Sequence, residues 1–335
     1  MKNRLVRRRH IICEAIYSSF FILHFSLFLL ACAGEKGGDA FTLLFTGDVL
    51  LDRGVRPVVE EKGVEYLFEG VADDFARADA VVINLECPLA DTLAPVGKQY
   101  IFHADTRWAA GLRAAGVTHA CMANNHTNDQ SRRGLRSTAQ ALEAAGIVPV
   151  GYGTSLAQQA QPTLIRKGDI TVALFNSVTF PLENWVPSDC LPDVCQLSAE
   201  ALAARIRSYK TAHPNHVVIA VLHWGMEFQQ TPSMRQRLGA AALASAGCDA
   251  VVGHHPHVVQ PLETISNDSI PVFYSLGNFV FDQTPPQTRQ AVMAEITLRP
   301  AEDGSGHPVS LSARAIPVNL RHCRPHRAPG RAREL

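Results

Sequence analysis

The feature that most constrains this fold is a repeated order of segments: a helix, a glycine, a short apolar strand and a polar loop. Helices expected over residues 106–115, 131–145 and 233–246 each end at a glycine, and an apolar run follows. Glycine is common just beyond a helix C-terminus, and short apolar runs are typical of buried strands. This alternation predicts an α/β fold with mainly parallel strands. Residues 291–298 and 309–316 alternate as half-exposed strands and predict a closing hairpin.

Three histidines follow one of these buried strands directly. His254, His255 and His257 lie in the stretch VVGHHPHVVQ, after an apolar run and a glycine. Ligand sites of open α/β sheets gather outside the carboxyl ends of the strands, and neutral imidazole is the commonest metal ligand. Pro256 stiffens the backbone between two of the histidines. One interpretation of this stretch is a metal site. The alternative is a surface turn that happens to be rich in histidine.

Other strand ends also carry side chains that can bind metal. Each has an ordinary structural explanation when taken alone, as a turn former or a hydrogen-bonded residue. The ends of parallel strands point the same way, so we expect these groups to converge on one crevice. A mixture of carboxylate, amide and imidazole suits a divalent metal such as Mn, Fe, Zn or Co better than Ca or Mg. The candidate ligands are Asp48, Glu86, Asn125, His223, His255 and His257.

Six short motifs occur in a fixed order along the chain. They are GD at 47–48, NLE at 84–86, NNH at 124–126, HWG at 223–225, GHHPHVVQ at 253–260 and SLGNFVFDQ at 275–283. As a set they resemble the CapA family of bacterial capsule proteins, which are linked to poly-γ-glutamate synthesis and export and are related to calcineurin-like metallophosphoesterases. The resemblance covers residues 41–317. It implies a metallophosphoesterase-like four-layer αββα sandwich.

The resemblance also implies roles for individual residues. The six candidate ligands keep that role, with His254 as an alternative to His255, and His126 becomes the residue that stabilises a transferring group, with Asp129 orienting its ring. The superfamily's first motif is Asp-x-His, but Leu50 replaces that histidine, and Glu86 replaces a bridging Asp. We therefore expect one firm metal site and a second, weak one. Arg53 is a candidate for binding a carboxylate or phosphate with its planar fork, or is an ordinary surface arginine.

The N-terminus has the pattern of an export signal. Residues 1–31 combine a basic arm with an apolar run, and the run ends in Leu-Leu-Ala before Cys32, which resembles a bacterial lipobox. We expect a lipoprotein anchored through Cys32 and facing the periplasm or cell exterior, or an uncleaved membrane anchor. Residues 32–40 then form a tether, 41–320 the domain, and 321–335 a basic, disordered tail. In an oxidising compartment, Cys190 and Cys195 are expected to form a disulfide.

Charge and resemblance together limit the function. The formal net charge is +0 at pH 7, and no broad basic field is present, so we exclude nucleic acid as a partner. The expected partners are an anionic capsule polymer or its precursor and the subunits of a membrane synthase. A metal-dependent hydrolase or transferase is favoured. The alternatives are a subunit that binds polyglutamate without turnover, and a periplasmic nucleotide-type phosphoesterase, which the missing Asp-x-His disfavours.

Overall fold

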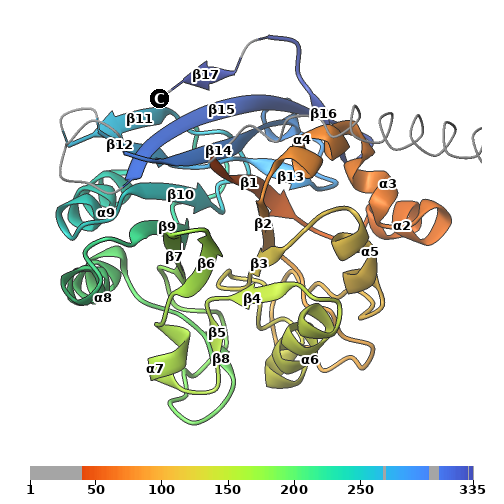
Figure 1. Ribbon diagram of the computed structural model, residues 1–335. Helices are drawn as coiled ribbons and strands as arrows, with labels where there is room; N and C mark the ends of the chain where they lie inside the picture. Colours follow the sequence, from red (N-terminus) through yellow and green to blue (C-terminus); the bar gives the residue numbers. More distant parts are fainter. Residues whose placement is uncertain (1–39, 267–268, 302–308, 331, 335) are drawn as a thin grey trace, which may run out of the picture. The chain divides into compact units, whose positions relative to one another are not determined.

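The computed structural model describes residues 40–266, 269–301, 309–330 and 332–334. Within that part, strands form two large sheets and one two-stranded sheet, and helices cover the outer faces of the large sheets (Figure 1). The expected α/β class and four-layer αββα arrangement are therefore confirmed. The signal peptide, the lipobox and nearly all of the tether lie outside the described residues.

The larger sheet has nine strands among the described residues. Its order is β16-β15-β14-β1-β2-β3-β4, with β13 beside β1 and β17 beside β15. The strands from β1 to β4 run parallel, and β14 with β15 forms the expected antiparallel hairpin. The bounds are β1 Phe41–Val49, β2 Ala80–Leu85, β3 His119–Cys121, β4 Val148–Val150, β13 Asn278–Val280, β14 Gln290–Pro300, β15 Val309–Arg321, β16 Arg324–Arg327 and β17 Arg333–Glu334.

The second sheet has six described strands in the order β11-β12-β10-β9-β7-β6. Its four central strands run parallel, and an antiparallel strand closes each edge. Their bounds are β6 Thr163–Lys167, β7 Ile170–Val178, β9 Val217–His223, β10 Ala250–His254, β11 Leu262–Ile265 and β12 Ile270–Phe273. The small sheet pairs β5 Tyr152–Gly153 with β8 Asp193–Val194.

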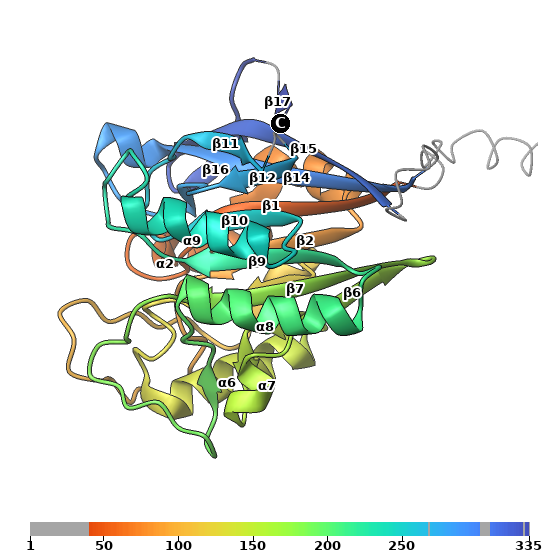
Figure 2. The same ribbon diagram turned by 90° about the vertical axis from the view of Figure 1, so that its left-hand side faces the viewer.

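The helices form the two outer layers. The bounds are α2 Arg56–Lys62, α3 Glu65–Phe68, α4 Ala72–Arg77, α5 Trp108–Ala114 and α6 Ser131–Ala144 beside the nine-stranded sheet, α8 Ala199–Ala212 and α9 Met234–Ser245 beside the six-stranded sheet, and the short α7 Leu156–Gln159. Helices α8 and α9 lie next to each other (Figure 2). Their starts are capped by the side chains of Ser198 and Ser233. No helix within the described ranges is both long enough and apolar enough to cross a membrane.

The central strands are apolar throughout because both of their faces are buried. In β1, Leu43 and Phe45 join the core between the two sheets, whereas Leu44 joins the core under the helices. In β9, Ile219 lies between the sheets and Val218 faces α8 and α9. Successive side chains of a strand point to opposite faces, so such a strand needs apolar residues at every position. This packing fixes the strand ends where the candidate ligands lie.

Two sequence expectations are wrong. The segment beyond residue 320 was expected to be disordered, but Arg324–Arg327 forms β16, which pairs with β15. Its composition resembles disorder, yet the free edge of β15 offers it a partner strand. The expected disulfide is absent, since Cys190 and Cys195 are both free thiols. Cys195 is buried while Cys190 is exposed, so the two side chains occupy different environments.

Candidate metal centre

Two residues of the nine-stranded sheet place carboxylates at the centre. Asp48 lies near the end of β1, and its backbone N–H donates to the carbonyl of Gly277 at 3.0 Å. A Cβ on Gly47 would lie only 2.0 Å from that carbonyl oxygen, so this close approach of the two chains requires glycine. Glu86 follows β2 directly, and its N–H donates to the carbonyl of Val49 at 2.8 Å. Both carboxylates are fully buried.

The six-stranded sheet supplies the imidazoles. His223 is the last residue of β9, and His255 and His257 follow β10. His255 has φ 98° and His257 φ 57°, in the left-handed region that is costly for residues other than glycine. Backbone strain of this kind persists where the surrounding structure enforces it, often at functional sites. The turn therefore holds both imidazoles in fixed positions.

The predicted ligands converge in two overlapping groups. Ligand atoms of Asp48, Glu86 and His257 lie within 4.8 Å of one another, and so do those of Glu86, His223 and His255. Glu86 belongs to both groups, and its Oε1 lies 3.8 Å from His223 Nε2 and 3.7 Å from His257 Nε2. Asn125 joins them, because its Oδ1 lies 2.8 Å from His223 Nε2. Residues from five separate strand ends thus meet in one place.

Unpaired buried oxygens show that a cation fits this site. Both carboxylate oxygens of Glu86 are buried and accept no hydrogen bond from any described residue, and Oδ2 of Asp48 lies 3.2 Å from His257 Nδ1. An unpaired buried carboxylate is costly unless it binds a cation or shifts its protonation. Two carboxylates with imidazoles and an amide oxygen form a donor set that suits a borderline divalent metal. The residues present therefore fit the metal that the sequence predicts.

Burial controls the protonation of these groups. It lowers the pKa of His255 to about 3, helped by the charge of His257, and it lowers the pKa of His223 well below the usual value. Both rings are therefore neutral at pH 7, the form that binds metal. Burial and the nearby Asp48 raise the pKa of Glu86 well above its usual value. Burial also opposes the charge of His257, but the carboxylates of Glu86 and Asp48 outweigh it and raise the pKa of His257 to about 9.

Three residues lie outside the two ligand groups. His254 Nε2 donates to the carbonyl of Thr46 at 2.8 Å, so the structure favours His255 over His254 as the ligand. Arg53 forms an ion pair with Asp282, and its guanidinium group lies over the rings of Phe102 and Phe281. The guanidinium group therefore already has partners within the protein. Leu50 is fully buried and packs in the core under the helices.

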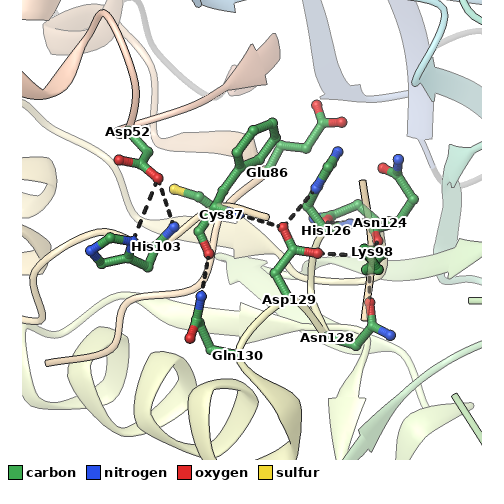
Figure 3. A network of polar contacts seen from close by, with 12 residues as sticks. Asp52, Glu86, Cys87, Lys98, His103, Asn124, His126, Asn128, Asp129 and Gln130 are labelled. Atoms are coloured by element: carbon green, nitrogen blue, oxygen red, sulfur yellow. Dashed lines mark hydrogen bonds and ion pairs between the residues drawn. The ribbon is translucent and has the colours of Figure 1, made fainter. Parts of the chain in front are cut away.

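His126 is held by a buried polar network (Figure 3). Its Nδ1 lies 2.7 Å from Asp129 Oδ2, as expected for a carboxylate that orients the ring. Lys98 Nζ donates to Asp129 Oδ1 at 2.6 Å and to the Asn125 carbonyl at 2.6 Å. The Phe102 ring stacks on His126 with the ring centroids 4.0 Å apart. One lysine thus supports both the amide ligand and the partner of His126.

Sequence reasoning missed Lys98 and two asparagines. Asn84 Nδ2 donates to Asp48 Oδ1 at 2.8 Å, and Asn278 Oδ1 accepts from His257 Nδ1 at 2.9 Å. Partners of this kind fix the orientation of metal ligands. Both asparagines lie inside quoted motifs, NLE and SLGNFVFDQ, so a search of the motifs for ligand partners would have found them. Lys98 lies in a loop without periodicity, and no local signal marked it.

A cavity of about 1000 Å³ opens beside the centre. His255 lines it, together with Phe180 and Pro181 from the long loop that follows β7. The Phe180 ring lies 4.9 Å from the His255 ring, so the loop forms one wall of the approach to the imidazoles. Glu200, Glu227, Arg235 and several uncharged residues complete the lining. A substrate of moderate size can reach His255 through this opening.

The chain is similar to several known proteins. Residues 42–283 match the model of a family described as "Bacterial capsule synthesis protein PGA_cap". The PGA biosynthesis protein CapA of Bacillus subtilis (strain 168) is 30% identical over 271 residues, which cover 80% of this chain and 70% of that protein. A Mycobacterium tuberculosis protein named "Probable polyglutamine synthesis accessory protein" is 25% identical over 87% of each chain. The solved NAD nucleotidase of Haemophilus influenzae is 12% identical with a TM-score of 0.49, covering 88% of this chain and 60% of that one.

Proposed function

The chain belongs to the bacterial capsule synthesis protein family PGA_cap, and on that premise we propose that it is a metal-dependent hydrolase or transferase acting on poly-γ-glutamate or its precursor. The observation that carries the proposal is Glu86, whose two unpaired oxygens lie between two groups of ligand atoms. A cation at this position would favour the charged form of the buried carboxylate, and a cation beside an open cavity is suited to chemistry. A membrane synthase is the proposed partner.

Each residue has a part in this proposal. A divalent ion held by the carboxylates, Asn125 and the three imidazoles would act as a Lewis acid toward the bond that is broken. Asp129 accepts the Nδ1 proton of His126, and burial lowers the pKa of His126, so the neutral ring leaves Nε2 as the atom that accepts a proton from the attacking nucleophile. Lys98 holds the Asp129 carboxylate in place through a buried ion pair in which Nζ lies 2.6 Å from Oδ1. Phe102 holds the ring of His126 flat against it.

A subunit that binds polymer without turnover is the second candidate. Leu50 occupies the position of the superfamily histidine and is fully buried, so it leaves one metal position with fewer ligands. An ion with an open position can bind the carboxylates of polyglutamate without breaking a bond. This arrangement would retain a polymer chain beside a synthase.

We also propose that the protein is exported and anchored through a lipid on Cys32. The support is the basic arm, the apolar run and the Leu-Leu-Ala-Cys ending in residues 1–32. A lipid anchor places the metal centre in the compartment where a capsule polymer is exported.

The test combines metal analysis with activity assays. The purified full chain is analysed for bound Mn, Fe and Zn, and is then incubated with γ-linked polyglutamate and with simple phosphoesters. Metal-dependent turnover that His255→Ala abolishes supports the enzyme. Polymer binding without turnover supports the second candidate, and failure to bind either metal or polymer contradicts both.

A further inference from the structure

A basic groove lies on the side of the metal centre formed by β13 and the C-terminal hairpin. Two cavities of about 440 and 310 Å³ share Arg321 and His322 in their linings. Phe281 and Arg289 line the first, and Lys62 and His326 line the second. We call these six residues the tail groove. The Phe281 ring lies 4.9 Å from the ring of His257, so one side chain separates this groove from a candidate metal ligand.

We propose that the tail groove is a binding site for a polycarboxylate chain, which it holds beside the metal centre. This inference rests on the proposed function, and it identifies where the polymer binds. The ligand class follows from charge, because a chain of carboxylates can contact more than one arginine side chain of the groove at once.

The charges of the groove are not balanced within the protein. Among the described residues, Arg289, Arg321 and His322 have no ion-pair partner, and all three are exposed. The acidic side chains of the two cavities are already paired, Asp282 with Arg53 and Glu61 with Lys62. Those acidic groups therefore do not cancel the charges of Arg289 and Arg321.

The positive field extends along β16. The pKa of His326 is lowered by partial burial and by the charges of Arg324, Arg321 and His322. Arg324 and Arg327 have acidic partners, Glu69 and Asp74, so they add less to the field. The groove therefore carries most of its unbalanced charge near Arg321, close to the cavity that contains Phe281.

The turn of the hairpin that carries these side chains has a strained backbone. His322 has φ 50° and Cys323 φ 64°, in the tight turn between β15 and β16. Two-residue turns with positive φ at both positions usually contain asparagine or glycine, which adopt this backbone more easily. His322 in this turn places an imidazole at the tip of the hairpin, next to Arg321.

The large cavity beside His255 is a poorer match for a polyanion. Its charged lining residues are Glu200, Glu227 and Arg235, two carboxylates against one guanidinium. Repulsion from those carboxylates would oppose a polyglutamate chain there. Charge thus favours the tail groove for the anionic chain and leaves the large cavity for an uncharged or cationic part of a substrate.

The test measures binding of fluorescein-labelled poly-γ-glutamate to the full chain in detergent, with a chelator present to remove metal. The double variant Arg289→Glu/Arg321→Glu is compared with Arg207→Glu, which reverses an exposed arginine on α8. The double variant should weaken binding about tenfold or more at low ionic strength, since it replaces two attractions by two repulsions, and the control should change it less than about twofold. Unfolding curves verify that each variant is folded.

Three results would overturn the inference: unchanged affinity in the double variant, an equal loss in Arg207→Glu, or equally tight binding of a short DNA duplex of the same charge. Glu86→Gln separates this inference from the proposed function. Glu86→Gln should lose metal binding yet keep the chelator-resistant polymer affinity. If wild-type protein binds polymer but no metal, the proposed function fails while the groove stands.

Discussion

Replacing Glu86 by glutamine tests the metal centre most directly. Glu86 is fully buried, both of its oxygens lack a hydrogen-bond partner among the described residues, and it belongs to both ligand groups. Glutamine keeps the shape of the side chain but removes its charge. The variant should therefore retain the fold and lose the metal.

The two effects differ in size. With a chelator present, burial and Asp48 favour the neutral form of Glu86, which glutamine resembles, so stability should change by less than about 1.5 kcal/mol. A metal at 100 times its dissociation constant stabilises wild-type protein by about 2.7 kcal/mol. At about 2–4 °C per kcal/mol, this corresponds to a rise in Tm of roughly 5–11 °C. Most of that rise should disappear in Glu86→Gln.

The assay is thermal unfolding of both proteins with a chelator and with added Mn or Zn. Glu295→Gln is the matched control, because its carboxylate pairs with Arg314 in the hairpin, away from the candidate ligands. The control should keep the full metal-dependent shift. A metal-dependent shift in Glu86→Gln equal to that of wild-type protein would refute the assignment of Glu86 as a ligand.

Three further predictions follow from the contacts and charges. Lys98→Met should destabilise the protein by about 3–5 kcal/mol in urea unfolding, because it removes the lysine that forms an ion pair with the buried Asp129. The control Lys167→Met, which removes an exposed ion pair, should cost about 1 kcal/mol or less. Equal losses in the two variants would contradict the role of Lys98. The pKa of His257 is about 9 in the folded protein and 6.5 ordinarily, so the stability from its proton is complete below pH 6.5 and is lost as pH rises through 9. Metal must displace this proton, so metal affinity measured by calorimetry should rise from pH 6.5 to 8.5, and a flat profile would argue against His257 as a ligand. Cys32→Ala should move the protein from the membrane to the soluble fraction, and unchanged membrane association would exclude the lipid as the anchor.

Local sequence signals predicted the fold well. Apolar runs with both faces buried and glycines after helices depend on neighbouring residues, so the strands and helices predicted from them lie close to their expected positions. β16 was missed because the basic, proline-containing composition beyond residue 320 resembles disorder, although a two-residue turn pairs this segment with β15.

For the site, the sequence by itself determined the chemical types of the ligands and the strand ends that carry them. Only the tertiary structure decided their distances and partners. It places Glu86 between His223 and His257. It also shows that His254 donates a hydrogen bond to the Thr46 carbonyl and that Arg53 forms an ion pair with Asp282. The physical reason is the distance along the chain over which each signal acts. Residue type and periodicity act over a few positions, whereas coordination depends on where two packed sheets bring atoms from distant parts of the chain.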